Sequence, residues 1–142
     1  MKVQSSTIEN KYLRVKSINI GACLYEVYDK KKKINLILNL GLTKNYISKN
    51  LYVGATCGRY AGRISNSKFN IKNKIYKLSG NEGKNTLHGG KIGFDRLEWK
   101  INHHSKNKII YQLLSKNLDQ GFPGDLNSEC IFEIKNKSLF IK

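Results

Sequence analysis

The chain has 142 residues, of which 39% are hydrophobic and 25% charged, which indicates a soluble globular protein with a core of its own. No apolar run approaches the roughly 20 residues of a membrane-spanning helix, and the polar N-terminus predicts no signal peptide. Cys23, Cys57 and Cys130 lack CxxC or zinc spacing. They predict reduced structural thiols in a cytoplasmic protein, with no metal and no cofactor.

The charge is strongly positive, with 26 Lys and Arg against 10 Asp and Glu, or +16. Such a balance is found in nucleic-acid binders, which usually favour arginine for contacts to bases and phosphates. Here only four basic residues are arginines, and the lysines are scattered apart from residues 30–33. The pattern favours a generally solvated charge over a functional basic face.

The N-terminal third is expected to be mostly β-structure, since short apolar and β-branched runs alternate with Asn, Lys, Gly and Asp. Residues 12–20 and 22–28 predict the first strand pair, with Gly21 at the bend. A strand over 34–38 follows a four-lysine turn. Residues 43–51 predict a single helical turn.

The rest of the chain continues this pattern around one long glycine-rich loop. Residues 68–71 and 75–78 flank Lys72-Asn73-Lys74 and predict a hairpin. Residues 79–97 lose the strand pattern, and a loop of that length is usually functional. The further strands are expected at 99–103, 109–114, 130–134 and 139–141. A turn at 136–137 followed by a strand only just begun predicts an open sheet edge, through which another chain or a second copy could associate.

Two glycine-bracketed motifs hold the candidate ligand-binding residues. Residues 54–64 read GATCGRYAGRI, and residues 85–90 read NTLHGG. The guanidinium of Arg63 offers several donors in fixed geometry, and a neutral His88 offers one donor and one acceptor, which suits sugar hydroxyls. The alternative is structural: Arg59 and Arg63 would pair with surface carboxylates, and His88 would cap a loop.

These motifs, followed by Gly-Phe-Asp at 93–95, Trp99 and Gly-Phe-Pro-Gly-Asp-Leu at 121–126, resemble the aldose 1-epimerase (galactose mutarotase) family in order and spacing. The resemblance runs from about residue 13 to the end. It implies an all-β fold, an antiparallel β-sandwich of the galactose mutarotase-like supersandwich type. On this comparison residues 1–142 form a single incomplete domain, truncated and lacking the C-terminal half.

The resemblance also implies which residues bind the sugar and which of the family's site residues are missing here. Arg63 and His88 would bind an aldohexose, and Gly62 stands where the family commonly has Asn, which weakens that contact. The family's acid and base are a His in an Asn-His-x-Tyr-Phe-like motif and a Glu near the C-terminus. Neither is found here, so no catalytic residue is assigned. The remaining histidines, His103 and His104, are expected at the surface.

The function implied is therefore that of an isomerase that interconverts the α and β anomers of hexoses such as galactose and glucose, weak or inactive as this chain alone. Two alternatives stay open. One is a noncatalytic carbohydrate-binding module that uses Arg63 and His88. The other is a basic nucleic-acid-binding β-domain in which tyrosines stack on bases. Trp99 and Phe94 are expected to anchor the glycine loop to the core.

Overall fold

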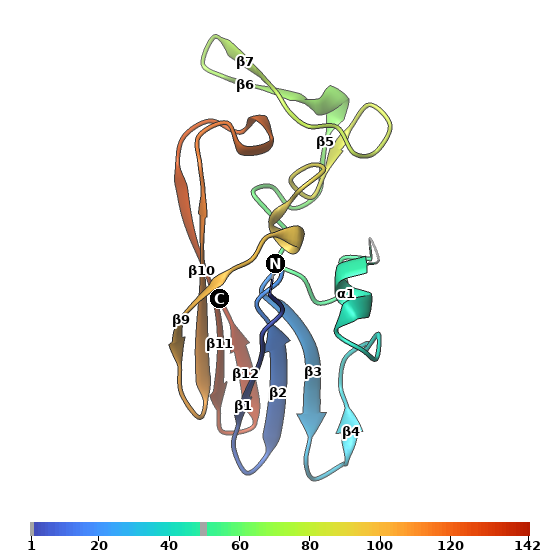
Figure 1. Cartoon of the computed structure of the whole chain (residues 1–142), viewed down its shortest axis with the longest axis vertical. Helices are drawn as coiled ribbons and strands as arrows, with labels where there is room; N and C mark the ends of the chain where they lie inside the picture. Colours follow the sequence, from blue (N-terminus) through green and yellow to red (C-terminus); the bar gives the residue numbers. More distant parts are fainter. Residues whose placement is uncertain (1, 49–50) are drawn as a thin grey trace.

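The computed structural model describes residues 2–48 and 51–142 and consists mainly of two four-stranded antiparallel sheets (Figure 1). The first sheet has the order β1-β2-β3-β4, with strands Ser5–Glu9, Leu13–Ile18, Cys23–Asp29 and Ile34–Asn35. The second has the order β12-β11-β10-β9, with strands Ser138–Ile141, Leu126–Lys135, Lys108–Ser115 and Lys100–His104.

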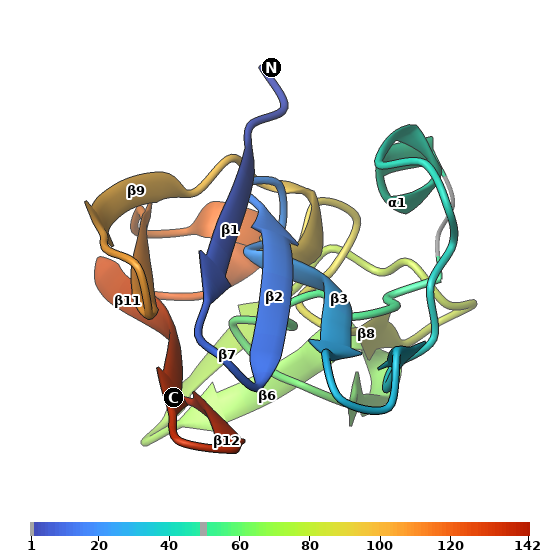
Figure 2. The same ribbon diagram turned by 90° about the horizontal axis from the view of Figure 1, so that it is seen from below.

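One hydrophobic core joins the two sheets, which lie against each other when the molecule is seen from below (Figure 2). Alternate residues of β1, β2, β10 and β11 are buried, as the two-residue period of a strand requires. The first sheet contributes side chains such as Val15, and the second contributes Tyr111 and Phe132. Ser17 and Tyr111 share a hydrogen bond of 2.8 Å between their hydroxyls across this core. The all-β antiparallel sandwich expected from the sequence is confirmed.

The smaller elements gather at one end of the sandwich (Figure 1). The hairpin of β6 (Lys68–Ile71) and β7 (Lys74–Lys77) extends beyond the sheets, and next to it β5 (Arg63–Ile64) pairs with β8 (Thr86–Leu87). Three 3₁₀ turns and one short helix complete the described chain. They are η1 (Ser65–Ser67), η2 (Phe94–Arg96), η3 (Asp119–Gly121) and α1 (Lys44–Ser48). No helix in the described ranges is long and apolar enough to cross a membrane.

The expected strand pairs are present, with corrected boundaries. Gly21 turns the chain between β2 and β3 with φ 68°, a conformation that glycine adopts readily. The strand expected at 34–38 ends at Asn35, whose side-chain oxygen accepts a hydrogen bond from the amide of Val27 at 2.9 Å. The expected helical turn is α1, although positions 49 and 50 of that prediction lie outside the described residues.

Three strands were missed, namely β1, β5 and β8. Strand β5 has only two residues, at the end of the first glycine motif. In β1 every second residue is buried, but one of these is Ser6, so the segment does not read as an apolar alternation. Strand β8 lies inside the long loop and has only two residues. The last turn is confirmed, and β12 pairs with β11 through four residue pairs.

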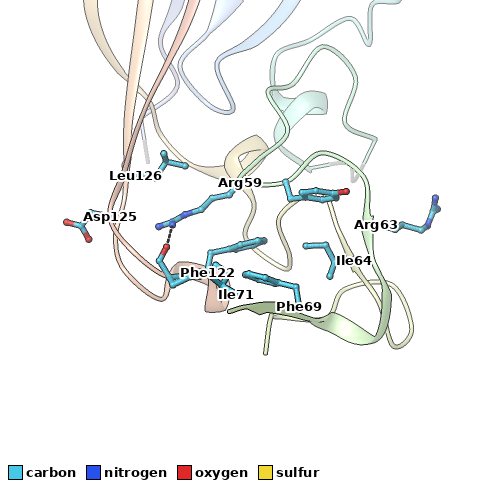
Figure 3. A pocket seen from close by; sticks show the side chains of 10 residues that line it. Arg59, Arg63, Ile64, Phe69, Ile71, Phe122, Asp125 and Leu126 are labelled. Atoms are coloured by element: carbon cyan, nitrogen blue, oxygen red, sulfur yellow. Dashed lines mark hydrogen bonds between the residues drawn. The ribbon is translucent and has the colours of Figure 1, made fainter. Parts of the chain in front are cut away.

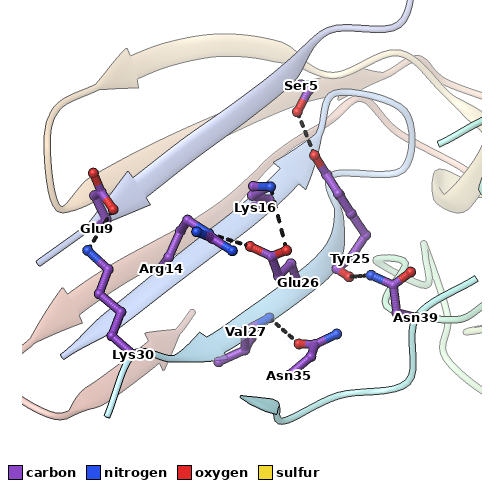
Figure 4. Close-up of polar contacts among 10 residues, drawn as sticks. All are labelled: Ser5, Glu9, Arg14, Lys16, Tyr25, Glu26, Val27, Lys30, Asn35 and Asn39. Carbon is purple, nitrogen blue, oxygen red and sulfur yellow. Dashed lines mark hydrogen bonds and ion pairs between the residues drawn. The ribbon is translucent and has the colours of Figure 1, made fainter. Parts of the chain in front are cut away.

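Some of the basic side chains form ion pairs with carboxylates on the outer face of the first sheet (Figure 4). Glu26 accepts from Arg14 at 2.7 Å and lies 3.5 Å from Lys16, and Lys30 donates to Glu9 at 2.7 Å. These pairs are partly buried, and Glu26 is only 16% exposed. They set basic side chains opposite acidic ones, so this face does not present an uninterrupted row of cations.

Candidate functional site

Close backbone contacts join the first glycine-rich motif to the second and to the Gly-Phe-Asp segment at 93–95 that follows it. The amide of Phe94 donates to the carbonyl of Gly58 at 3.1 Å, and a Cβ on Gly89 would fall inside van der Waals contact with the same carbonyl. A Cβ on Gly58 would in turn collide with the Phe94 ring. Glycine at 58 and 89 is therefore required for the close approach of the two loops.

Strand pairing brings the backbones of the predicted ligand residues together. Arg63 of β5 is paired with Leu87 of β8. One step along, the amide of His88 donates to the carbonyl of Gly62 at 3.0 Å, and the amide of Gly62 donates to Nδ1 of His88 at 3.1 Å. The position where the family commonly has Asn thus uses its backbone to hold the imidazole. That Arg63 and His88 reach one sugar ring stays a prediction.

The side chain of Arg63 is held by a carboxylate that the sequence analysis did not select. Nε and Nη2 donate to the two oxygens of Glu82 at 2.5 and 2.6 Å. Arg63 is 64% exposed, so the pair is solvated. The hydrogen bond from Arg63 lowers the pKa of Glu82, and the positive charge of Arg63 acts in the same direction. Glu82 lies six residues before His88 in the same glycine loop, which is the signal that could have identified it.

His88 has two further neighbours. The Tyr52 ring meets the imidazole edge-on, with the centroids 4.7 Å apart. Asp95 of η2 lies within electrostatic range of His88, and burial raises the pKa of its carboxyl against the opposing effect of Arg96. Tyr52 therefore contacts the predicted sugar-binding histidine directly, and two carboxylates, those of Glu82 and Asp95, lie within electrostatic range of it.

Arg59, in contrast, is a structural clamp. Its Nε donates to Oγ of Ser115 at 2.8 Å, and its other nitrogens donate to four backbone carbonyls between 2.7 and 3.1 Å. These carbonyls belong to Ser115, Lys116, Pro123 and Gly124. Arg59 thus ties the first motif to the corner between β10 and β11. The structural alternative, in which Arg59 pairs with a surface carboxylate, is wrong for this residue, whereas Arg63 does make such a pair, with Glu82.

Replacing Arg59 with Lys is expected to lower the free energy of unfolding by about 2–3 kcal/mol, because a lysine cannot reproduce five donors in one plane and leaves charge-assisted bonds unmade. Urea denaturation measures the loss. Arg63→Lys is the matched control and should change stability by less than about 1 kcal/mol, since its pair is exposed. Equal losses in the two variants would contradict the clamp.

The raised pKa of Asp95 predicts a pH-dependent stability with a defined sign. A carboxyl that holds its proton more tightly when folded destabilises the fold as pH rises through its titration. Asp95→Asn should therefore gain stability relative to the wild type as pH rises above about 3.9, the ordinary aspartate pKa. Urea denaturation over this range measures the difference.

Asp125→Asn is the control for the Asp95 prediction and should behave in the opposite way. The hydrogen bond from Lys116, reinforced by the amide of Asn117, lowers the pKa of Asp125. Ionisation of this carboxyl therefore stabilises the fold. Asp125→Asn should become less stable relative to the wild type as pH rises. Parallel pH slopes for the two variants would contradict the assigned directions.

The remaining predicted residues lie where expected. His103 and His104 are exposed on β9, and Nε2 of His104 lies 2.9 Å from the carbonyl of Thr7. Trp99 and Phe94 are buried in the core, confirming their structural role. Among the cysteines, Cys23 is buried, and burial raises the pKa of its thiol to about 12, which suits an inert structural thiol.

Comparisons with known proteins agree with this fold and these motifs. The aldose 1-epimerase of Haemophilus influenzae is 37% identical over 129 residues, which is 87% of this chain and 37% of that protein. The galactose mutarotase of Sus scrofa is 35% identical over 142 residues, covering 98% of this chain and 41% of that protein. The chain thus spans about two fifths of the length of these relatives.

Solved structures have the same architecture. An aldose epimerase homologue from C. elegans superposes with a TM-score of 0.86 at 27% identity, covering 94% of this chain and 42% of that one. A galactose 1-epimerase from Lactobacillus acidophilus gives 0.82 at 27% identity, over 96% of this chain and 45% of the other. The family model described as aldose 1-epimerase matches residues 4–142. By sequence, motifs and fold, this chain belongs to the aldose 1-epimerase family.

Proposed function

We propose that this chain supplies the sugar-orienting part of an aldose 1-epimerase, with Arg63 and His88 binding an aldohexose. The observation that carries the proposal is the reciprocal hydrogen bonding of Gly62 and His88 next to the β5–β8 pair. It brings the two motifs of the family resemblance into direct contact. The names of the relatives, aldose 1-epimerase and galactose mutarotase, support the same substrate class.

The hydrogen bonding also suggests what each group would offer to a sugar. Because Nδ1 of His88 accepts an amide proton, the neutral ring carries its own proton on Nε2, which can donate to a sugar oxygen. Glu82 occupies Nε and Nη2 of Arg63, so Nη1 is the nitrogen best placed to donate to a ligand hydroxyl. Glu82 would then fix the orientation of the guanidinium.

As a catalyst the 142-residue polypeptide is proposed to be weak or inactive. Anomer interconversion needs one group to protonate the ring oxygen and another to remove the proton of the C1 hydroxyl. The residues to which the family resemblance assigns these steps have no counterpart in the sequence. Arg63 and His88 would bind and orient the ring, as a carbohydrate-binding module does.

The organisation of the chain is part of the proposal. Residues 1–142 are taken as one unit of a larger sandwich, because both sheets share one core. The reduced thiols support a cytoplasmic location. Strand β12 ends its sheet, and an end strand can pair with another chain or a second copy.

Titration with galactose, followed by amide NMR shifts of the ¹⁵N-labelled protein, tests the sugar site. Saturable shifts are expected at residues 62–63 and 86–89, with at least about tenfold weaker binding in Arg63→Ala and His88→Ala. His104→Ala is the matched control, since that histidine lies on β9, and it should bind like the wild type. Absence of saturable shifts, or equal binding by all variants, would reject the sugar site.

A further inference from the structure

We propose that the end of the sandwich opposite the β6–β7 hairpin is an electrostatic docking surface for an anionic lipid bilayer. Four turns build this end, and we call it the lysine-rich end. They are residues 10–12 between β1 and β2, 30–33 between β3 and β4, 105–107 between β9 and β10, and 136–137 between β11 and β12. All four lie at the lower end of the molecule in Figure 1. The inference concerns a different surface from the sugar site and does not rest on sugar binding.

Hydrogen bonds hold the four turns against one another. The amide of Lys30 donates to the carbonyl of Tyr12 at 2.9 Å. The side-chain amide of Asn10 donates to the carbonyl of Asn136 at 2.7 Å. The last amide of β1 donates to the carbonyl of Lys106, also at 2.7 Å. The β1–β2 turn and the strand end before it therefore contact each of the other three turns, so the lysine-rich end is one continuous surface.

The charge of this surface is strongly positive. Its twelve turn residues contain no acidic residue and seven lysines, namely Lys11, Lys30, Lys31, Lys32, Lys33, Lys106 and Lys137. All of these lysines except Lys30 are exposed. The carboxylates next to the turns are engaged, since Glu9 pairs with Lys30 at 2.7 Å and Asp29 accepts the amides of residues 31 and 32. The lysines are scattered along the sequence, but strand pairing gathers these seven at one end.

Two of these lysines share one aromatic ring. Nζ of Lys11 lies 5.0 Å from the centroid of the Tyr12 ring, and Nζ of Lys137 lies 5.4 Å from it. Cation–π attraction offsets part of the repulsion between the two ammonium groups. Among the described residues, neither lysine forms an ion pair with a carboxylate. An anionic surface would therefore supply a countercharge that the chain itself does not place there.

The side chains of the lysine-rich end favour a lipid surface over a nucleic acid. Clusters of basic residues of this size attract the anionic headgroups of a bilayer without needing a defined geometry. The four turns contain no arginine, the residue whose planar fork suits phosphate and base recognition. The Tyr12 ring is covered by lysines and is not free to stack on a base. Ile34, 48% exposed directly after the 30–33 turn, adds an apolar side chain that can enter the headgroup region.

The opposite end of the sandwich has a different character and supplies a control. There the β6–β7 hairpin borders an apolar hollow of about 640 Å³ that is also lined by Leu126 (Figure 3). The turn of this hairpin carries Lys72 and Lys74, both of which are exposed. Substitutions at these two lysines change the net charge of the chain without touching the lysine-rich end.

Vesicle flotation of the full 142-residue chain tests the proposal. The chain should bind vesicles of phosphatidylcholine with phosphatidylserine, but not vesicles of phosphatidylcholine alone. Binding should be lost in about 1 M salt, where the Debye length falls to about 3 Å. Lys31→Glu/Lys32→Glu should weaken binding at least about tenfold, because it replaces two attractive charges with repulsive ones. Lys106→Glu/Lys137→Glu, which changes two other turns, should do the same.

Lys72→Glu/Lys74→Glu is the matched control, since it makes the same change in net charge at the other end. Its binding should stay within about threefold of the wild type, because its charges are screened from a bilayer docked at the lysine-rich end. Equal losses in all three variants would assign the binding to net charge and overturn the proposal. Absence of binding to the phosphatidylserine vesicles would overturn it as well.

Titration of the same proteins with a fluorescent single-stranded RNA oligonucleotide tests the class of partner. RNA binding without vesicle binding, weakened by the turn variants and not by the hairpin variant, would make the partner a nucleic acid and overturn the lipid assignment. Lys31→Gln/Lys32→Gln guards against misfolding caused by charge reversal. It removes the two charges without reversing them and should weaken vesicle binding less than the glutamate pair does, and unchanged binding would count against the proposal.

Discussion

Trp99→Ala is expected to lower the free energy of unfolding by about 3–5 kcal/mol, the usual loss for a buried aromatic. The indole is only 1% exposed, and its Nε1 donates to the carbonyl of Phe94 at 3.0 Å. The two rings meet edge to face, with centroids 5.7 Å apart. Removing the indole would leave a cavity and an unsatisfied carbonyl at the base of the glycine loop. Urea or thermal denaturation measures the loss.

Trp99→Phe is the control, since it keeps an aromatic ring in the core but loses the indole donor. It should lose clearly less stability than the alanine variant. Because Trp99 anchors η2, sugar binding should weaken only as far as the variant unfolds. A Trp99→Ala protein that is fully folded and has lost sugar binding alone would show that the indole is a stacking platform for the ligand.

The purified 142-residue polypeptide is expected to catalyse mutarotation poorly. A general acid or base typically contributes about 10²–10⁴-fold each, and the two act as a unit, so their losses do not simply multiply. Orientation by Arg63 and His88 alone is expected to leave the rate close to that of the buffer. Polarimetry of freshly dissolved α-glucose or α-galactose measures it directly.

His88→Ala separates the two explanations of any activity that is found. A rate well above the buffer background that disappears in this variant would contradict the prediction. It would mean that His88, with Glu82 or Asp95 beside it, transfers protons itself. His104→Ala, an exposed histidine on β9, controls for nonspecific imidazole catalysis and should behave like the wild type.

Local pattern was enough to predict most of the β-structure. The hairpin at β6–β7 and the strands β9 to β12 follow from alternating apolar residues and from turn residues between them, both of which are properties of neighbouring positions. The motifs at 54–64 and 85–90 gave the family resemblance, and with it the sandwich type. Glycine at 58 and 89 is required by the contact of the two loops, although the sequence indicated only that some close approach occurs.

The sequence could not give the partners of the site residues. Arg59 and Arg63 stand four positions apart in one motif, yet one ties the β10–β11 corner and the other pairs with Glu82. Their surroundings come from segments 19 to 65 residues away, and no local period encodes such contacts.

By itself, then, the sequence determined that the chain is an antiparallel sandwich of this family with Arg63 and His88 as its candidate ligand residues. Only the tertiary structure decided that Ser6 lies in a core-facing strand, that Gly62 holds the His88 ring, and that an apolar hollow lies open beside Leu126. The physical reason is the same in each case. Burial, pairing and cavity shape are set by residues distant in the sequence, whereas periodicity and motif spacing report only on neighbours.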